Sequence, residues 1–244
     1  MSRNGNSADS LIKATESRAK FSGHGTAKGA QGFSSEEATS TVLARTGDTE
    51  IINPQEHSYE DIRIGLSWDE MLVENKSFPS KLFKKHFYKP VDLDLGCLYE
   101  LQDGTRGVIQ AFGDSYGAYD SAPYIFHSGD ERTGESEGDD ESILINGKHW
   151  PDIKRILLYV YIYDGAPHWA SIRPRIFIDV PGEKDMEARL GVADSSCVIC
   201  AVAGIENVRN GMKITNYTEY FHGHNGMDRA FGFGIRWNDG QKES

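Results

Sequence analysis

The pattern of apolar and polar positions in this chain changes near Tyr59. After that residue, short runs of apolar, β-branched and aromatic residues alternate with segments rich in Gly, Asp, Asn and Pro, which is typical of strands and turns. Residues 62–68 alternate as a strand with one buried face does, and residues 92–98 carry carboxylates on one face and leucines on the other. Residues 156–163 are apolar or aromatic throughout, which predicts a central strand covered on both faces.

Further strands and turns follow from the same signals. Additional strands are expected at residues 107–112, 172–180, 196–203, 212–220 and 230–237. Hairpin turns are expected at Asp103-Gly104, Asn210-Gly211 and Asn225-Gly226. Many short strands, frequent turns and the lack of a long helical pattern after residue 60 indicate an all-β fold, specifically an antiparallel β-sandwich.

The first part of the chain has a different composition. Residues 1–57 are rich in Ser, Gly, Ala and Thr, and Phe21 and Phe33 are their only aromatic residues. Such a segment buries too little apolar surface to offset the entropy lost on ordering. We therefore expect a disordered low-complexity tail over residues 1–57 and one β-sandwich domain over residues 58–244.

The charge, hydropathy and cysteine content of the chain argue against several classes of protein. The 244 residues carry a formal net charge of −11, which argues against a nucleic-acid-binding protein, because phosphate contacts need clustered Lys and Arg. No apolar stretch approaches the length of a transmembrane helix, and no secretory signal is expected at the N-terminus. Three widely spaced cysteines do not make a disulfide framework. Together these features predict a cytoplasmic, soluble protein.

Residues 130–141 contain seven carboxylates in twelve positions. Carboxylates at this density repel one another, and a bound Ca²⁺ would offset the repulsion because this ion takes six to eight oxygen ligands. A solvated acidic loop is the alternative, as for most charge runs. The segment is not an EF-hand loop, because Arg132 and Glu135 stand where that loop needs an acid or amide and a glycine.

A second acidic element is the pair Asp92 and Asp94. They are two positions apart on a predicted strand, so both side chains point to one face. Asp69 and Asp164 each follow the end of a predicted strand, where an Asp either starts a turn or serves as a cation ligand. One loop does not easily surround a calcium ion, so these carboxylates are candidates to complete the coordination.

Other reactive side chains give weaker signals. Cys197 and Cys200, together with Cys97, His222 or His224, are candidates for a zinc site, but the apolar run around the pair predicts buried strand cysteines instead. The chain contains no nucleophile elbow, no zinc-protease motif and no phosphate-binding glycine loop. We therefore expect a binding protein and not an enzyme.

The order of these acidic elements resembles that in the TerD family of bacterial tellurite-resistance and stress proteins. The resemblance spans roughly residues 58–240, and its elements are residues 68–69, 92–94, 128–134, 138–141 and 161–164. Residues 92–101 and 233–237 resemble the TerA branch of the family more than TerD itself.

The resemblance implies a calcium-binding β-sandwich that acts without catalysis in tellurite resistance and in stress or phage defence. It implies one or two calcium ions, a place in the cytoplasm or at the inner face of the membrane, and contacts with other tellurite-resistance proteins or with that membrane through calcium. The implied metal ligands are Asp92, Asp94, Asp130, Thr133, Gly134, Glu135, Glu137, Asp139, Asp140 and Glu141, with Asp69 and Asp164 as further candidates. The alternatives are a scaffold with no functional metal and a metal-assisted hydrolase.

Overall fold

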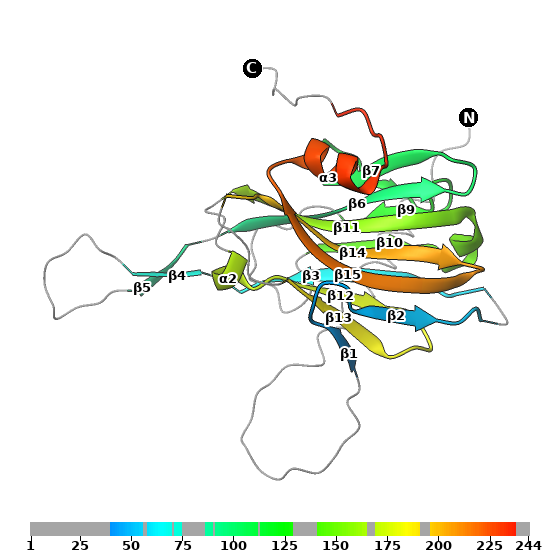
Figure 1. The fold of residues 1–244 in the computed structure, drawn as a ribbon, viewed down its shortest axis with the longest axis horizontal. Coiled ribbons are helices and arrows are strands. Elements are labelled where there is room, and N and C mark those ends of the chain that lie inside the picture. The colour runs from blue at the N-terminus through cyan, green and yellow to red at the C-terminus, as the bar shows by residue number, and fades with distance from the viewer. Residues whose placement is uncertain are drawn as a thin grey trace, which may run out of the picture.

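Two β-sheets packed face to face form the body of the protein, a β-sandwich, in this computed structural model (Figure 1). The structure describes residues 40–55, 58–69, 71–74, 86–89, 91–111, 113–128, 141–164, 169–190 and 196–237, with the backbone alone described at 71–74 and 86–89. Apolar side chains from both sheets meet in one buried core between them. The predicted all-β fold is confirmed, and 58–237 contributes most of its described strands.

The first sheet has seven strands and the second has six. The first sheet runs, in spatial order, β1 (Ser40–Leu43), β13 (Asp185–Arg189), β12 (Arg175–Asp179), β3 (Ile62–Ser67), β10 (Glu141–Ile145), β9 (Ile125–His127) and β8 (Gly117–Ala118). The second runs β2 (Thr49–Ile52), β15 (Gly211–Phe221), β14 (Ile199–Val208), β11 (Ile153–Asp164), β6 (Asp92–Leu101) and β7 (Arg106–Gln110). Neighbouring strands are antiparallel except β1 and β13, which are parallel.

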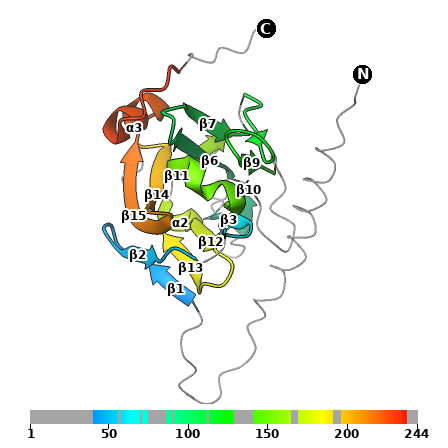
Figure 2. The same cartoon turned by 90° about the vertical axis from the view of Figure 1, so that its right-hand side faces the viewer.

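One hairpin and three short helices complete the described structure. They are the hairpin of β4 (Met71–Glu74) with β5 (His86–Lys89), the 3₁₀-helix η1 (Gly147–Asp152), and the helices α2 (Trp169–Ile172) and α3 (His224–Phe231). Figure 2 shows α3 beside β14 and β15, on the side of the six-stranded sheet that faces away from β12 and β13. No helix in the described residues is long and apolar enough to cross a membrane.

The strands predicted from alternation occur where expected. In β6, Leu93 and Leu95 are fully buried in the core between the sheets, whereas Leu98 faces the opposite side and packs in the cluster that includes α3. β11 lies between β14 and β6, in the middle of its sheet, and its side chains are buried on both faces. Its continuous apolar sequence therefore reflects burial on two sides, as predicted.

The expected boundary of the tail at residue 57 is wrong for residues 40–52. β1 and β2 lie in this segment and form one edge of each sheet. Leu43 and Ile52 are each only 3% exposed, so the segment is part of the core. Four-residue edge strands give too short an alternation to stand out against a Ser- and Thr-rich background. Residues 1–39 lie outside the described part of the chain.

The expected turn at Asn225-Gly226 and strand at residues 230–237 are also wrong. Residues 224–231 form α3, which ends at Gly232 in the left-handed conformation (φ 66°). The Gly232 N–H donates to the Asp228 carbonyl at 2.8 Å, a common way to end a helix. After the helix the chain has no regular secondary structure, and the Asp228 carboxylate accepts hydrogen bonds from Gly234 N, Ile235 N and Trp237 Nε1.

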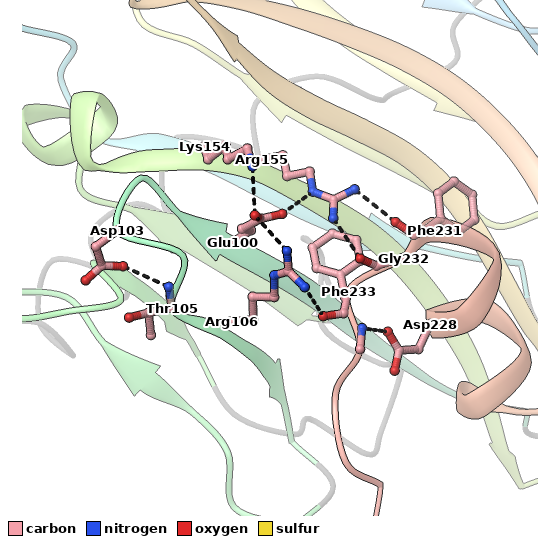
Figure 3. Close-up of polar contacts among 11 residues, drawn as sticks. Glu100, Asp103, Thr105, Arg106, Lys154, Arg155, Asp228, Phe231, Gly232 and Phe233 are labelled. Atoms are coloured by element: carbon pink, nitrogen blue, oxygen red, sulfur yellow. Dashed lines mark hydrogen bonds and ion pairs between the residues drawn. The ribbon is translucent and has the colours of Figure 1, made fainter.

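Buried Glu100 on β6 also holds this C-terminal segment, through cations that surround it (Figure 3). Its carboxylate accepts hydrogen bonds from Lys154 at 2.8 Å, Arg155 at 2.6 Å and Arg106 at 3.1 Å. Burial is the largest single effect and opposes ionisation, but these bonds outweigh it and lower the pKa of Glu100 to about 2. The two arginines also donate to the carbonyls of Phe231, Gly232 and Phe233.

Candidate metal site

Asp92 and Asp94 begin β6 and lie on the face of the sheet that points away from the core. The leucines between and after them, Leu93 and Leu95, fill the core, so strand alternation directs both aspartates to the opposite side. Asp94 is 7% exposed, and its partner in the β6–β11 register is Tyr161. The predicted sharing of one face by these two residues is confirmed.

The two further candidates, Asp164 and Asp69, belong to different parts of the fold. Asp164 is the register partner of Asp92 at the end of β11, just after an irregularity that follows Ile162. Asp69 instead forms ion pairs in the other sheet, with Arg173 at 2.7 Å and Arg175 at 3.1 Å. The ladder of β6 and β11 therefore brings Asp92 and Asp164 together beside Asp94, while Asp69 pairs with two arginines.

Glu141 is the only residue of the acidic segment 130–141 that the structure describes. It begins β10 and is 1% exposed, with its side chain directed between the sheets. Its Oε2 atom accepts a hydrogen bond from the backbone N–H of Leu95, the residue that follows Asp94. The end of the acidic segment is thereby fixed beside the aspartate pair.

His127 on β9 makes a second side-chain contact with the backbone of Leu95. Its Nε2 lies 2.8 Å from the Leu95 carbonyl oxygen and 3.6 Å from Glu141 Oε2, and the ring is fully buried. Sequence reasoning missed His127 because it is isolated in the chain. The available signal was its place two residues after buried Ile125, which gives both side chains the same inward face.

A buried tyrosine lies close to the acidic side chains of this region. Tyr159 on β11 is buried, and its hydroxyl donates to Gln110 Oε1 at 2.5 Å. Burial raises the pKa of Tyr159 well above its usual value, and the acidic groups of Cys97, Asp94 and Glu141 raise it further. Asp94 and Glu141 therefore act on the same phenol from two different sheets.

The other predicted ligands lie outside the described residues. They are Asp130, Thr133, Gly134, Glu135, Glu137, Asp139 and Asp140. The two ends of their segment are joined, because Ser128 N donates to Ser142 O at 2.9 Å and Ser142 N donates to Ser128 Oγ at 3.1 Å. The segment thus leaves and re-enters the fold beside Glu141 and β6.

The donor set suits a hard cation, since carboxylate oxygens are the ligands that Ca²⁺ prefers. Within the described ranges, no group of three or more His, Cys, Asp or Glu side chains converges closely enough to hold a metal ion. Asp92 and Asp94 would therefore need further ligands to hold an ion. The remaining predicted ligands fall mainly in the segment 129–140 that separates β9 from β10.

The cysteines do not resemble a metal or redox centre. Cys97 and Cys200 are buried, and burial raises the pKa of both thiols, which disfavours the reactive thiolate. Cys197 is partly exposed, with its Sγ 3.9 Å from His222 Nδ1. The prediction of buried strand cysteines is confirmed for Cys200 and is wrong for Cys197, which is partly exposed and precedes β14.

Known proteins resemble this chain in sequence, although no protein-family model matches it. It is 38% identical over 185 residues, 76% of its length, to the tellurium resistance protein TerA of Alcaligenes sp.. It is 30% identical over 128 residues, 51% of its length, to the tellurium resistance protein TerD of Alcaligenes sp.. The chain spans about half the length of these relatives, 53% of TerA and 56% of TerD.

A solved structure is also similar. It is the crystal structure of a homologue of telluride resistance protein (TerD) from Streptomyces coelicolor A3(2), at 16% identity and a TM-score of 0.44, over 70% of this chain and 95% of that one. The two sequence relatives carry the family assignment, because they match the chain at 38% and 30% identity. On that similarity, the chain belongs to the TerD family and is TerA-like.

Proposed function

We propose that this protein is a calcium-dependent interaction module of a tellurium-resistance and stress-response system, and that it has no catalytic activity. The relatives' names supply the system, since both are tellurium resistance proteins. The structure supports the calcium part through one observation. The outward-facing pair Asp92 and Asp94 lies next to Leu95, whose N–H is bound by the last residue of the acidic segment.

The proposed ligands come from strand β6 and from the acidic segment 130–141. Asp92 and Asp94 belong to β6, which pairs with β11 along one edge. Asp164 of β11 is the register partner of Asp92. The carboxylates at residues 130–140 would supply the rest, and one or two ions would fit this number of oxygens. Bound calcium would supply positive charge that offsets the mutual repulsion of these acids.

A thermal melt tests this proposal directly. At calcium one hundred times above its dissociation constant, binding to the folded state adds about 3 kcal/mol to the free energy of unfolding. For a domain of this size, that raises the melting temperature by roughly 5–11 °C relative to EDTA. The double variant Asp92→Asn/Asp94→Asn should lose this rise and give no binding heat in calorimetry.

A charge-matched control separates a specific site from general screening of the net charge. The variant Asp120→Asn/Asp185→Asn removes two exposed carboxylates, one next to Tyr119 and one in β13, and should keep the full calcium response. An identical melting temperature in calcium and EDTA for the wild-type protein would favour a scaffold with a solvated acidic loop. A full response in the Asp92/Asp94 variant would show that another site binds the ion.

We further propose that calcium connects this acidic protein to its partners, which are other tellurite-resistance proteins or the inner face of the membrane. With a net charge of −11, contact with anionic lipid needs a cation as a bridge. The protein should sediment with phosphatidylserine-containing vesicles in calcium and stay in solution in EDTA. Equal amounts in the pellet under both conditions would exclude a calcium bridge to lipid.

A further inference from the structure

In the described part of the chain, β6 has no neighbouring strand at Leu95 on the edge where β7 ends. β7 pairs with β6 from Glu100 to Gly96, and it ends at Gln110, the partner of Gly96. At Leu95, the residue before Gly96, the backbone N–H and carbonyl on this edge bind side chains of the other sheet. Glu141 accepts from the Leu95 N–H, and the Leu95 carbonyl lies 2.8 Å from His127 Nε2.

The hydrogen-bond roles follow from the atoms involved. A carbonyl oxygen only accepts, so His127 Nε2 carries the proton and donates it to Leu95. The N–H of Leu95 only donates, so Glu141 Oε2 accepts. One donor and one acceptor, carried by β9 and β10, thus reproduce the pair of backbone groups that an adjacent strand would offer. All three residues are buried, so water does not compete for these bonds.

This contact controls the orientation of Asp94. The peptide between Asp94 and Leu95 is planar, so fixing the direction of the Leu95 N–H also fixes the backbone torsion that follows the Asp94 Cα. The ladder with β11 fixes the opposite edge, where Tyr161 is the register partner of Asp94. The Asp92–Asp94 segment is therefore held on one edge by backbone and on the other by two buried side chains.

We propose that Glu141 and His127 are positioning residues, which hold β6 so that Asp92 and Asp94 present their carboxylates to a divalent cation. The inference rests on the proposed calcium function, and it assigns Glu141 a role other than the metal ligand that the family resemblance implies. In this role the hydrogen-bond acceptor of Glu141 matters and its charge does not. The corresponding requirement at position 127 is a donor that reaches the Leu95 carbonyl.

Paired variants distinguish positioning from ligation. Glu141→Gln keeps an acceptor for the Leu95 N–H and removes the charge, whereas Glu141→Ala removes both. Calcium affinity measured by calorimetry should change less than threefold in Glu141→Gln and fall at least tenfold in Glu141→Ala. His127→Gln, which keeps a donor, and His127→Leu, which does not, should show the same contrast. Loss of affinity in Glu141→Gln equal to that in Asp94→Asn would overturn the proposal.

Hydrogen exchange without calcium tests the contacts of Leu95 separately from calcium binding. Hydrogen exchange of the Leu95 amide should be slow in the wild type and in Glu141→Gln, and at least tenfold faster in Glu141→Ala. The Ile162 amide, which bonds to Val198 O at 2.9 Å, is the control and should be unchanged.

The outcomes differ for the two proposals. If the wild type binds no calcium, the proposed function fails, and the positioning role fails with it whatever the Leu95 amide does. If the wild type binds calcium and Glu141→Ala binds it equally well, only the positioning role fails. Should Glu141→Ala not fold, the folded variants Glu141→Gln and Asp94→Asn still decide between positioning and ligation.

Discussion

His224, the first residue of α3, places its imidazole among three aromatic rings. Trp237 stacks on it with ring centroids 4.7 Å apart, and Tyr159 and Tyr161 approach from β11 at 5.4 and 5.2 Å. Its Nε2 atom is buried and has no hydrogen-bond partner in the described structure. Burial lowers the pKa of His224 to about 4, since the charged imidazolium would lose hydration there.

This histidine should make the protein less stable in mild acid. In the unfolded chain its pKa is near 6.5, so between pH 6.5 and about 4 the unfolded state binds more protons than the folded state. The free energy of unfolding is unaffected above pH 6.5 and falls as the pH drops, by roughly 3 kcal/mol in total at 1.36 kcal/mol per pKa unit. Urea unfolding from pH 7 to 4 measures this loss.

The aromatic variant His224→Phe keeps ring packing and removes the titration. Its free energy of unfolding should fall less steeply than that of the wild type between pH 6.5 and 4. The matched control is His222→Phe, which makes the same substitution at an exposed histidine two positions earlier. Equal slopes for His224→Phe and the wild type would contradict the proposed role of burial.

Residue-level prediction of the site succeeded where the signal was local. Alternation alone placed Asp92 and Asp94 on one face of a strand, because the period of a strand is two. The contacts of Leu95 with Glu141 and His127 join residues 46 and 32 positions apart. They depend on how two sheets are stacked, and neither periodicity nor spacing carries that information.

At the scale of elements, the turn between β14 and β15 differs by one residue from its prediction. Val208 pairs with Gly211, so the two-residue loop is Arg209 and Asn210, with φ of 54° and 68°. Both residues adopt the left-handed conformation that a tight type I′ hairpin turn requires. Gly211 is the first residue of β15, and a side chain there would lie 2.6 Å from the Ile52 carbonyl oxygen of β2.

Gly211 should therefore be required for the close approach of β2 to the hairpin. The substitution Gly211→Val should lower the free energy of unfolding by about 1–3 kcal/mol, because the added methyl groups push against the backbone of Ile52. Gly223→Ala is the control, since its Cβ would meet no atom within 4 Å and its backbone is extended. Chemical denaturation of both variants tests this, and a Gly211→Val midpoint equal to that of the control would contradict it.

The sequence did not predict β10, β13 or α3, and each omission has a physical reason. β10 was missed because Glu141 continues the acidic segment in sequence, although its side chain is inside the sandwich. β13 was missed because only Met186 and Ala188 of its five residues face the core. α3 was missed because a helix of eight residues with one strongly buried apolar side chain, Met227, has little periodicity to detect.

At the scale of the whole molecule, the segment 40–52 closes one side of the sandwich. β1 extends the first sheet and β2 extends the second, so a single short segment covers an edge of each. Buried Asn216 of β15 holds the segment between β1 and β2. Its Nδ2 donates to Leu43 O at 2.7 Å, and its backbone carbonyl accepts from Gly47 N at 2.8 Å. The domain is therefore larger than composition indicates, since a polar segment supplies the edges of an apolar core.

Two truncations should distinguish the structural boundary from the compositional one. A chain that begins at residue 40 keeps β1 and β2, whereas a chain that begins at residue 58 removes both and leaves β13 and β15 as edges. The longer chain should melt at least 10 °C higher, because the shorter one exposes the core contacts of Leu43 and Ile52 and leaves the Asn216 side chain without its Leu43 acceptor. Calorimetric melts of both chains in EDTA make the comparison independent of metal binding. Equal melting temperatures would show that residues 40–57 are dispensable and that the boundary predicted from composition is the energetic one.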